Sequence, residues 1–192
     1  NSAFYGCINL ESVTIPNITK INYNGFRGCK SLTNISIPNV TSIGDNAFYD
    51  CESLTNISIP NVEIIYSYTF CGCKALANIY MPNVTSIGAN AFSGCTALAD
   101  INLVNITSIG DSAFGSCRSL TNISIPNVTS IRSAVFMNCT NLESVTLPNV
   151  TSIGSNAFSG CESLTDISIS DDVTTIGTNT FRRCTGITSI SL

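Results

Sequence analysis

The chain of 192 residues contains no His and no Trp, and only 10% of its residues are charged. The absence of His removes the side chain that most often acts as a general base, and the Ser and Thr residues recur at regular intervals instead of marking one nucleophile. The paired carboxylates Asp171 and Asp172 lie in a sequence typical of a turn. We therefore predict no catalytic residue and no enzymatic activity.

Positive charge is also sparse. The 8 Lys and Arg residues are scattered and the formal net charge is -4, so no basic stripe exists to neutralise phosphates, and we expect no nucleic-acid partner. No apolar run approaches the roughly 20 residues that span a bilayer, and the first residues lack a basic start followed by an apolar core. We expect no membrane span and no export signal in this segment.

What the chain does have is a repeat. Its nine Phe residues are spaced 22 residues apart seven times and then 23 apart. Three residues after each Phe stands a Cys, and three after that a Leu or Ile, before the phrase I-x-I-P-N-V-T-x-I-G that the second unit completes at Gly44. A period of roughly 20 to 29 residues with such aliphatic positions is typical of a solenoid, in which stacked coils supply the core.

The fold of one coil follows from the second unit. Ile35 and Ile37 alternate with polar residues, which predicts a half-buried strand paired in parallel with its copies in neighbouring coils. Pro38 ends that strand, and Val40 and Ile43 return to the core. The spacing of three between Phe, Cys and Leu favours a short helical or 3₁₀ turn with Phe and Cys facing inward. We predict a repeat solenoid of about nine coils of 22 to 23 residues, with a parallel β-sheet on one face and short strands, turns or 3₁₀ segments on the other.

The repeat occupies residues 1–192, so we predict a single domain. The chain begins on "NSAF", which matches "DSAF" at residues 111–114, and ends on "ITSISL", a first strand without its return. Neither end carries the polar capping unit that a solenoid normally needs. We therefore expect a fragment of a longer array that lacks both capping units, whose end coils offer strand edges for end-to-end self-association.

The phrase "IPNVTSIGDNAFYDCESLTNISIP" resembles the leucine-rich repeats of the BspA-like, or Treponema-type, family, and the resemblance covers essentially the whole chain. It implies a leucine-rich repeat protein at the cell surface or secreted, which adheres to host proteins or to other cells. The strand face is the usual recognition surface of such repeats. One departure is that most units have only Asn between Pro and Val, where the family commonly has two residues. The longer form occurs in "SDDVTTIG" at residues 170–177, and we expect it to bulge and to change the twist there.

Nine of the ten cysteines are repeat positions. Equivalent side chains in stacked coils stay about 4.8 Å apart, whereas the Cβ atoms of a disulfide lie nearer about 3.8 Å, so we expect free buried thiols. A straight line of thiols does not surround a metal ion, and we predict no metal site and no cofactor. Cys71 differs because it directly follows Phe70, where we expect exposure. It is a possible exposed thiol that can oxidise or cross-link, or else an inert surface residue.

Two further patterns each have a functional and a structural interpretation. Ten Asn residues stand in N-x-S/T sequences, which a eukaryotic secretory pathway can glycosylate, but the Asn after each Pro also suits a turn whose backbone it satisfies. Five of the six Tyr residues occur in the first 68 residues, on the side away from the first strands. They form either a docking patch or ordinary packing of the rim. They are Tyr5, Tyr23, Tyr49, Tyr66 and Tyr68.

The exposed columns of the strand face are the positions one, two and four residues after each Leu. They hold mostly hydroxyl and amide side chains, with four acids, no base and one aromatic residue. Such side chains can hydrogen-bond a protein or a glycan but provide few hot-spot contacts, so we expect weak binding that adds up over many coils; the alternative is that they are merely solvated. The predicted ligand-binding residues are Asn56, Ser58, Asn78, Tyr80, Asp100, Asn102, Asn122 and Ser124.

Two functions remain open. The first is a non-enzymatic surface or secreted module that binds a host or neighbouring-cell protein through the strand face. The second is a structural spacer, a stiff rod that presents another domain. Loss of adhesion on replacing Tyr80, Asp100 and Asn102 would favour the first, and dependence on the number of repeat units would favour the second.

Overall fold

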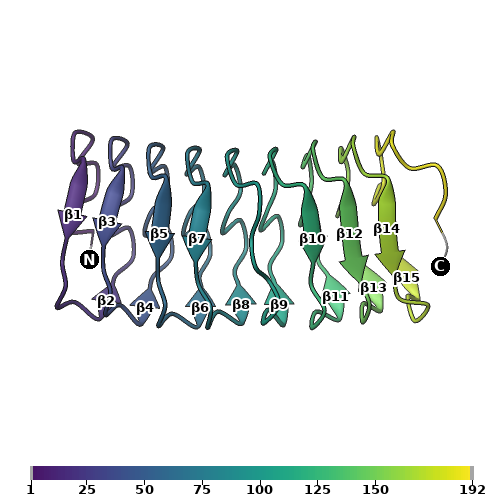
Figure 1. The fold of residues 1–192 in the computed structure, drawn as a ribbon, viewed down its shortest axis with the longest axis horizontal. Coiled ribbons are helices and arrows are strands. Elements are labelled where there is room, and N and C mark those ends of the chain that lie inside the picture. The colour runs from purple at the N-terminus through teal and green to yellow at the C-terminus, as the bar shows by residue number, and fades with distance from the viewer. Residues whose placement is uncertain (1, 191–192) are drawn as a thin grey trace.

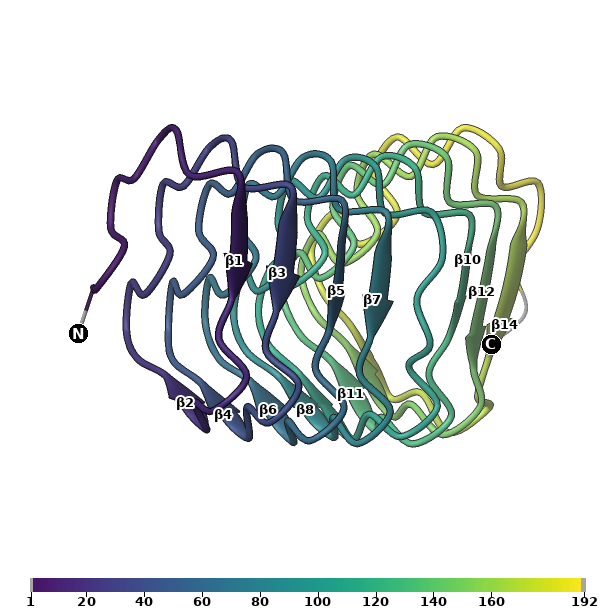
Figure 2. The same ribbon diagram turned by 60° about the vertical axis from the view of Figure 1, so that its left-hand side comes forward.

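The computed structural model describes residues 2–190 as a stack of coils with β-strands along one face and shorter strands along another (Figures 1 and 2). Each complete coil begins with a turn around Phe and returns through a two-residue second strand, and all but the fifth have a first strand between the two. Eight coils are complete, and a ninth begins with the turn around Phe181. The predicted solenoid is confirmed. In the expected last strand, residues 187–190 form none, and residues 191–192 lie outside the described part.

The first strands have three or four residues each and form the strand face. They are β1 (Ser12–Thr14), β3 (Asn34–Ser36), β5 (Asn56–Ser58), β7 (Asn78–Tyr80), β10 (Asn122–Ser124), β12 (Ser144–Leu147) and β14 (Asp166–Ile169). The second strands are β2 (Lys20–Ile21), β4 (Ser42–Ile43), β6 (Ile64–Ile65), β8 (Ser86–Ile87), β9 (Ser108–Ile109), β11 (Ser130–Ile131), β13 (Ser152–Ile153) and β15 (Thr175–Ile176).

All strand pairs are parallel and their register follows the repeat, so that Asn122 of β10 faces Ser144 of β12. The first strands form the ladders β1–β3, β5–β7 and β10–β12–β14, and the second strands form β2–β4, β6–β8–β9 and β11–β13–β15. In the last pair Ser152 faces Thr175, one residue beyond the usual offset. The extra residue of "SDDVTTIG" is therefore absorbed in the turn between β14 and β15, and its effect on twist stays a prediction.

The core is a column of aromatic rings. Each Phe stacks on the Phe of the next coil, with ring centroids 4.9 to 5.6 Å apart and interplanar angles of 2 to 13°. The seven inner rings, from Phe26 to Phe158, are buried with the Cys and Leu columns beside them. Fully burying one such side chain contributes about 1.5 to 3 kcal/mol, so stacking is what stabilises coils that bury little by themselves.

The segments that carry Phe and Cys are turns, and no helix is present among residues 2–190, so none that could cross a membrane. In the third of these turns, Ala47 N–H donates to the Gly44 carbonyl and Cys51 N–H to the Phe48 carbonyl. Asn46 and Asp50, with φ of 56° and 55°, occupy the left-handed region in these turns. A left-handed residue every few positions prevents helix, which is why the predicted helical or 3₁₀ turn is a run of β-turns instead. Phe and Cys face inward as predicted.

Side chains join each coil to the one before it. The Asn that follows the Pro position, which holds Val104 in one coil, donates from Nδ2 to the carbonyl at the preceding coil's Pro position. These bonds are 2.6 to 3.0 Å long in six coils. This confirms the predicted structural role of that Asn and places the acceptor in the neighbouring coil. The Cys thiols likewise donate to Phe carbonyls of the preceding coil at 3.0 to 3.2 Å.

Candidate binding site on the strand face

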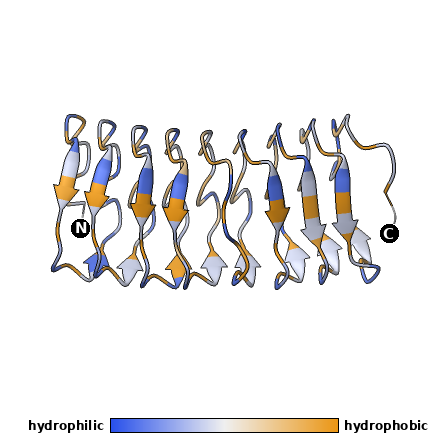
Figure 3. Cartoon of the chain, viewed as in Figure 1, coloured by the Kyte–Doolittle hydropathy of each residue, from blue (hydrophilic) through white to orange (hydrophobic). Residues whose placement is uncertain are grey.

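The strand face presents polar side chains to solvent while aliphatic residues between them enter the core, as the mixed colouring of each first strand shows (Figure 3). All eight residues predicted from the sequence are exposed. They come from four consecutive coils. Asn56 and Ser58 belong to β5, Asn78 and Tyr80 to β7, Asp100 and Asn102 to the next coil, and Asn122 and Ser124 to β10.

The fifth coil interrupts this face. Residues 100–103, which the repeat predicts to be a strand, form none, and within the described residues no backbone hydrogen bond joins them to β7 or β10. Ile101 and Leu103 are nevertheless buried. The segment therefore keeps its place in the core but leaves the ladder. The expectation of a continuous sheet is wrong at this coil, and also between β3 and β5, which are not paired although each coil there has its strand.

A local substitution explains the interruption. Val104 stands where most units have Pro, so it carries an N–H, and this N–H donates to Oδ1 of Asn102 at 3.1 Å. Asn side chains that bond backbone two residues ahead form turns that compete with strand pairing. The equivalent coils cannot make this bond where the residue is Pro, because Pro has no N–H. Asn102 thus favours a turn at the position of a strand.

The disturbance is confined to the strand face. Behind it, β9 of the same coil pairs with β8, and Phe92 stacks on Phe114 with a centroid separation of 5.3 Å. Below it, Asn105 Nδ2 donates to the Pro82 carbonyl at 2.9 Å. The fifth coil is therefore stacked behind the strand face like its neighbours, and the opening is confined to that face.

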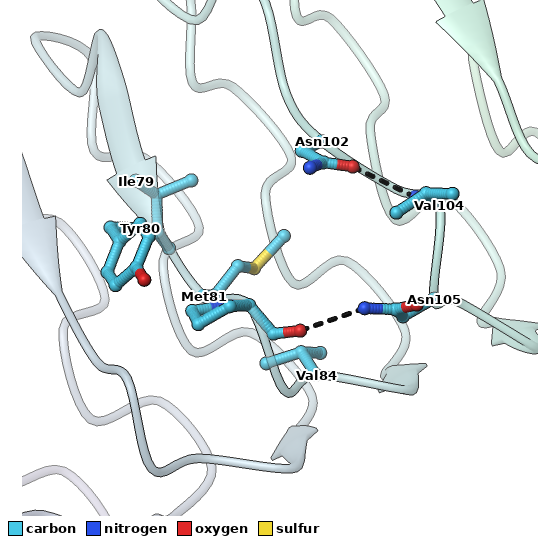
Figure 4. Close-up of a pocket in the computed structure, with 8 residues that line it drawn as sticks. Ile79, Tyr80, Met81, Val84, Asn102, Val104 and Asn105 are labelled. Atoms are coloured by element: carbon cyan, nitrogen blue, oxygen red, sulfur yellow. Dashed lines mark hydrogen bonds between the residues drawn. The ribbon is translucent and has the colours of Figure 1, made fainter.

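On the β7 side of the interruption lies a small hollow of about 80 Å³, here named the apolar slot. Met81, which stands where other units have Ile or Leu, extends its side chain toward the segment that carries Asn102 (Figure 4). Met81 is buried, whereas Val104 is 49% exposed and Tyr80 59% exposed at the edge of the slot. The slot is lined by Ile79, Tyr80, Met81, Pro82, Val84, Asn102, Val104 and Asn105.

On the β10 side lies a wider and shallower hollow of about 450 Å³, here named the polar hollow. Its polar groups are already ordered, since Ser144 Oγ donates to Asn122 Oδ1 at 2.6 Å and Asn122 Nδ2 donates to Thr121 Oγ1 at 3.0 Å. Asp100 is the one charged residue among those that line it. They are Asp100, Ile101, Asn102, Leu103, Val104, Asn122, Ile123, Ser124, Pro126, Ser144 and Thr146.

The structure brings together five of the eight predicted residues. Tyr80, Asp100, Asn102, Asn122 and Ser124 line one or both hollows. The other three are exposed on β5 and β7 but line neither hollow: Asn56, Ser58 and Asn78.

Sequence reasoning missed Met81 and Val104. The repeat itself contained the signal, because both residues replace the aliphatic and Pro of the usual phrase in two successive coils. The site is therefore marked by departures from the repeat at a core-facing position, Met81, and at a turn position, Val104, as well as at exposed positions.

Cys71 is not the exposed thiol that its position predicted. It is half-buried, because the turns of neighbouring coils stack over it, and burial together with the Asp50 carboxylate raises its thiol pKa. This makes it less reactive than an open thiol. The expected exposure is thus only partial, and whether Cys71 oxidises or cross-links stays a prediction.

The repeated cysteines are free thiols. Burial raises the pKa of Cys29 to about 11 and that of Cys117 to about 12, so these side chains are neutral near pH 7. The described residues contain no group of His, Cys, Asp or Glu arranged to hold a metal ion. The thiol column acts as packing and as a hydrogen-bond ladder.

The Tyr residues of the first coils form a second exposed surface. Tyr5, Tyr23, Tyr66 and Tyr68 are 41 to 57% exposed. The Arg27 guanidinium lies 4.6 Å from the ring centroid of Tyr49 and 5.9 Å from that of Tyr5, within the range of cation–π attraction. Whether this surface docks a partner stays a prediction.

Parallel strands in register, aliphatic columns and stacked turns define a solenoid of the leucine-rich repeat class. The family described as "BspA type Leucine rich repeat region (6 copies)" matches residues 1–121 and 107–192. The chain belongs to this family, as its resemblance predicted. Proteins of this fold are typically non-enzymatic binding scaffolds.

Solved structures of bacterial repeat proteins are similar. A leucine-rich repeat protein from Bacteroides ovatus is 26% identical with a TM-score of 0.72, over 96% of this chain and 76% of that chain. The leucine-rich repeat protein of T. pallidum is 31% identical with a TM-score of 0.74, over 80% of this chain and 77% of that chain. A leucine rich cell surface protein from Faecalibacterium prausnitzii is 29% identical with a TM-score of 0.60, over 88% and 62% respectively. A search of curated proteins finds no match.

Proposed function

We propose that this chain is a non-enzymatic protein-binding module, displayed at a cell surface or secreted, that adheres to host or neighbouring-cell proteins through its strand face. The interruption at the fifth coil is the observation that supports this most directly. It is flanked by two adjoining hollows that share Asn102 and Val104. A concave feature with a few convergent polar groups is what a binding surface needs and what a plain spacer does not.

The surface location is supported by similarity. The F. prausnitzii protein is described as a cell surface protein and is 29% identical. The sequence supplies no His for catalysis, and the face carries Asn, Ser and Asp side chains suited to hydrogen bonding. We therefore favour binding over catalysis.

The test is adhesion of beads coated with the 192-residue chain to immobilised extracellular and cell-surface proteins. Tyr80, Asp100 and Asn102 are replaced together by Ala. The control replaces Asn56 and Ser58, which are also exposed on the strand face but line neither hollow. We expect at least tenfold weaker adhesion for the triple variant and unchanged adhesion for the control. Unchanged adhesion by the triple variant, with circular dichroism showing a native fold, would contradict the proposal.

The spacer remains a second candidate, because one apolar core runs without a break from Ile21 to Leu164 and stiffens the stack. Deleting residues 24–67 removes two coils and rejoins equivalent positions, since Tyr68 takes the place of Asn24. Adhesion that falls on this deletion but survives the triple replacement identifies a spacer. Adhesion with the opposite pattern identifies a binding module.

A further inference from the structure

The apolar slot has the size of one aliphatic side chain. An apolar cavity of about 150 Å³ accommodates a benzene ring, and the slot measures about 80 Å³. Its walls include Ile79, Met81 and Val84, and Met is the most adaptable apolar side chain. A branched side chain such as Leu, Ile or Val fits a space of this kind, and burying it would contribute about 1.5 to 3 kcal/mol before the cost of association.

The polar hollow presents a negative charge without a cation. Both ion pairs among the described residues involve Glu52, with Lys30 and Lys74 at 2.9 Å, and Asp100 belongs to neither. No Lys or Arg lines the hollow. The same holds along the exposed columns of the strand face, where the charged residues are the acids Glu11, Asp100, Glu143 and Asp166. This charge is complementary to a cationic ligand and would set specificity more than affinity.

The two hollows lie on opposite sides of one short segment, because Asn102 and Val104 line both. Neighbouring coils in such a stack are about 4.8 Å apart, so sites one coil to either side are separated by about 5 to 10 Å. In an extended peptide, side chains two residues apart point to the same face at about 6.6 Å. A peptide that runs along the stack, across the strands, can therefore place alternate side chains in the two hollows.

We infer that the fifth coil binds an extended segment of a partner protein in which an aliphatic residue enters the apolar slot and a Lys or Arg two positions away pairs with Asp100. This inference rests on the proposed function and specifies its partner. The Tyr80 ring at the edge of the slot adds contact area at low cost in side-chain freedom. The pair with Asp100 is exposed, so it should weaken as salt is added.

The test uses ¹⁵N-labelled protein and the synthetic peptide Gly-Ser-Leu-Ser-Arg-Ser-Gly, followed by NMR titration because weak binding is expected. Three control peptides replace Leu by Ser, replace Arg by Glu, or place Leu and Arg next to each other. We expect shifts confined to coils four to six, and at least fivefold weaker binding of each control peptide. Shifts spread evenly over the molecule, or equal binding of all four peptides, would overturn the inference.

Two variants define the roles of the hollows. Asp100→Asn should remove most of the preference for Arg over Glu and most of the salt dependence, while the matched control Asp166→Asn, at the equivalent position of β14, should keep both. Val104→Pro, which restores the usual phrase, should remove the preference for Leu over Ser. If Asp166→Asn changes the preference as much as Asp100→Asn, charge on the whole face and not this site is responsible, and the inference fails.

Failure of this inference can be told apart from failure of the proposed function. If the peptides do not bind but the Tyr80, Asp100 and Asn102 triple variant still loses adhesion, the face binds protein by other chemistry and only the inference falls. If soluble oligosaccharides change the NMR shifts of the same residues and the peptides change none, the ligand is a glycan. The inference of a protein partner is then wrong. If the triple variant adheres normally and no peptide binds, both proposals fall.

Discussion

The side-chain Oδ1 of Asn102 accepts a hydrogen bond from the backbone N–H of Val104 at 3.1 Å, across the point where a first strand would otherwise lie. The bond depends on two departures from the repeat, because it needs an amide side chain at one position and a residue other than Pro at the other. It holds the fifth coil out of the strand ladder while the core behind it stays stacked.

Restoring the repeat should therefore close the interruption. For Val104→Pro we expect loss of the turn bond and pairing of residues 100–103 with a neighbouring strand. The net change in the free energy of unfolding should be small, because the new strand pairing offsets the hydrogen bond that Pro abolishes. Urea unfolding followed by circular dichroism measures the free energy, and hydrogen exchange at Asn102 and Leu103 measures the pairing. Asn102→Ala removes the acceptor of the same bond without altering the backbone type, so it should slow exchange in the same segment. Faster exchange in both variants would show that the turn bond does not cause the interruption.

The aromatic column should dominate stability. Phe92 is completely buried between Phe70 and Phe114, and Phe92→Ala should cost about 3 to 5 kcal/mol, because it leaves a cavity that stacked neighbours cannot fill. Phe4, which has a stacking partner on one side in the described residues and is only half-buried, provides the control. Phe4→Ala should cost clearly less in the same thermal and urea unfolding experiments. Equal costs would show that neither full burial nor stacking on both sides sets the contribution of the ring.

The Asn ladder should be measurable one residue at a time. Asn61 is exposed, yet its Nδ2 donates to the Pro38 carbonyl at 3.0 Å, so Asn61→Ala should destabilise the chain by about 0.5 to 1.5 kcal/mol. Asn34, an exposed strand residue in the preceding coil, serves as control, and Asn34→Ala should stay within about 0.5 kcal/mol. Urea unfolding compares the two. A loss at Asn34 as large as that at Asn61 would remove the ladder as the explanation.

The rate at which each Cys is alkylated should decrease as its side chain becomes more buried. In the native protein at pH 8, iodoacetamide should modify the exposed Cys7 first and the half-buried Cys71 and Cys184 more slowly, with the seven buried thiols reacting after urea is added. Mass spectrometry of peptides identifies the order. Rapid native modification of Cys95 or Cys117 would show that the coils open far more readily than this packing implies.

The same thiols should make stability fall at alkaline pH. Burial raises the pKa of Cys29 from 9.0 to about 11, so above pH 9 the unfolded chain loses a proton that the folded chain retains. The folded state then binds more protons, and the free energy of unfolding decreases as pH rises from 9 to 11, whereas the full contribution is present below pH 9. Urea midpoints between pH 7 and 11 measure this decrease. Cys29→Ala should show a shallower decline, and an unchanged slope would assign the effect to other groups.

How far the sequence predicts this protein is clearest from single positions. The spacing of Phe and Cys predicts the solenoid, the buried columns and the free thiols, because a side chain that recurs once per coil must stack on its own copies. The pattern of three did not reveal that Asn46 and Asp50 are left-handed, since Asn and Asp are tolerated both in turns and at helix ends. Cys71 looked exposed because its position varies, and only the stacking of adjacent turns shows that it is half-buried.

The sequence by itself therefore determined the repeat, the inward columns and the polar character of the strand face, because these properties are local and periodic. Only the tertiary structure decided where that face opens. Tyr80 and Met81 in one coil, Asn102 and Val104 in the next, and Asn122 in a third are far apart along the chain. They line two adjoining hollows because coils stack in register and one of them leaves the ladder. Periodicity predicts which positions are equivalent. The loss of a strand depends instead on whether the side-chain bond of Asn102 or the strand ladder is more stable in the folded chain.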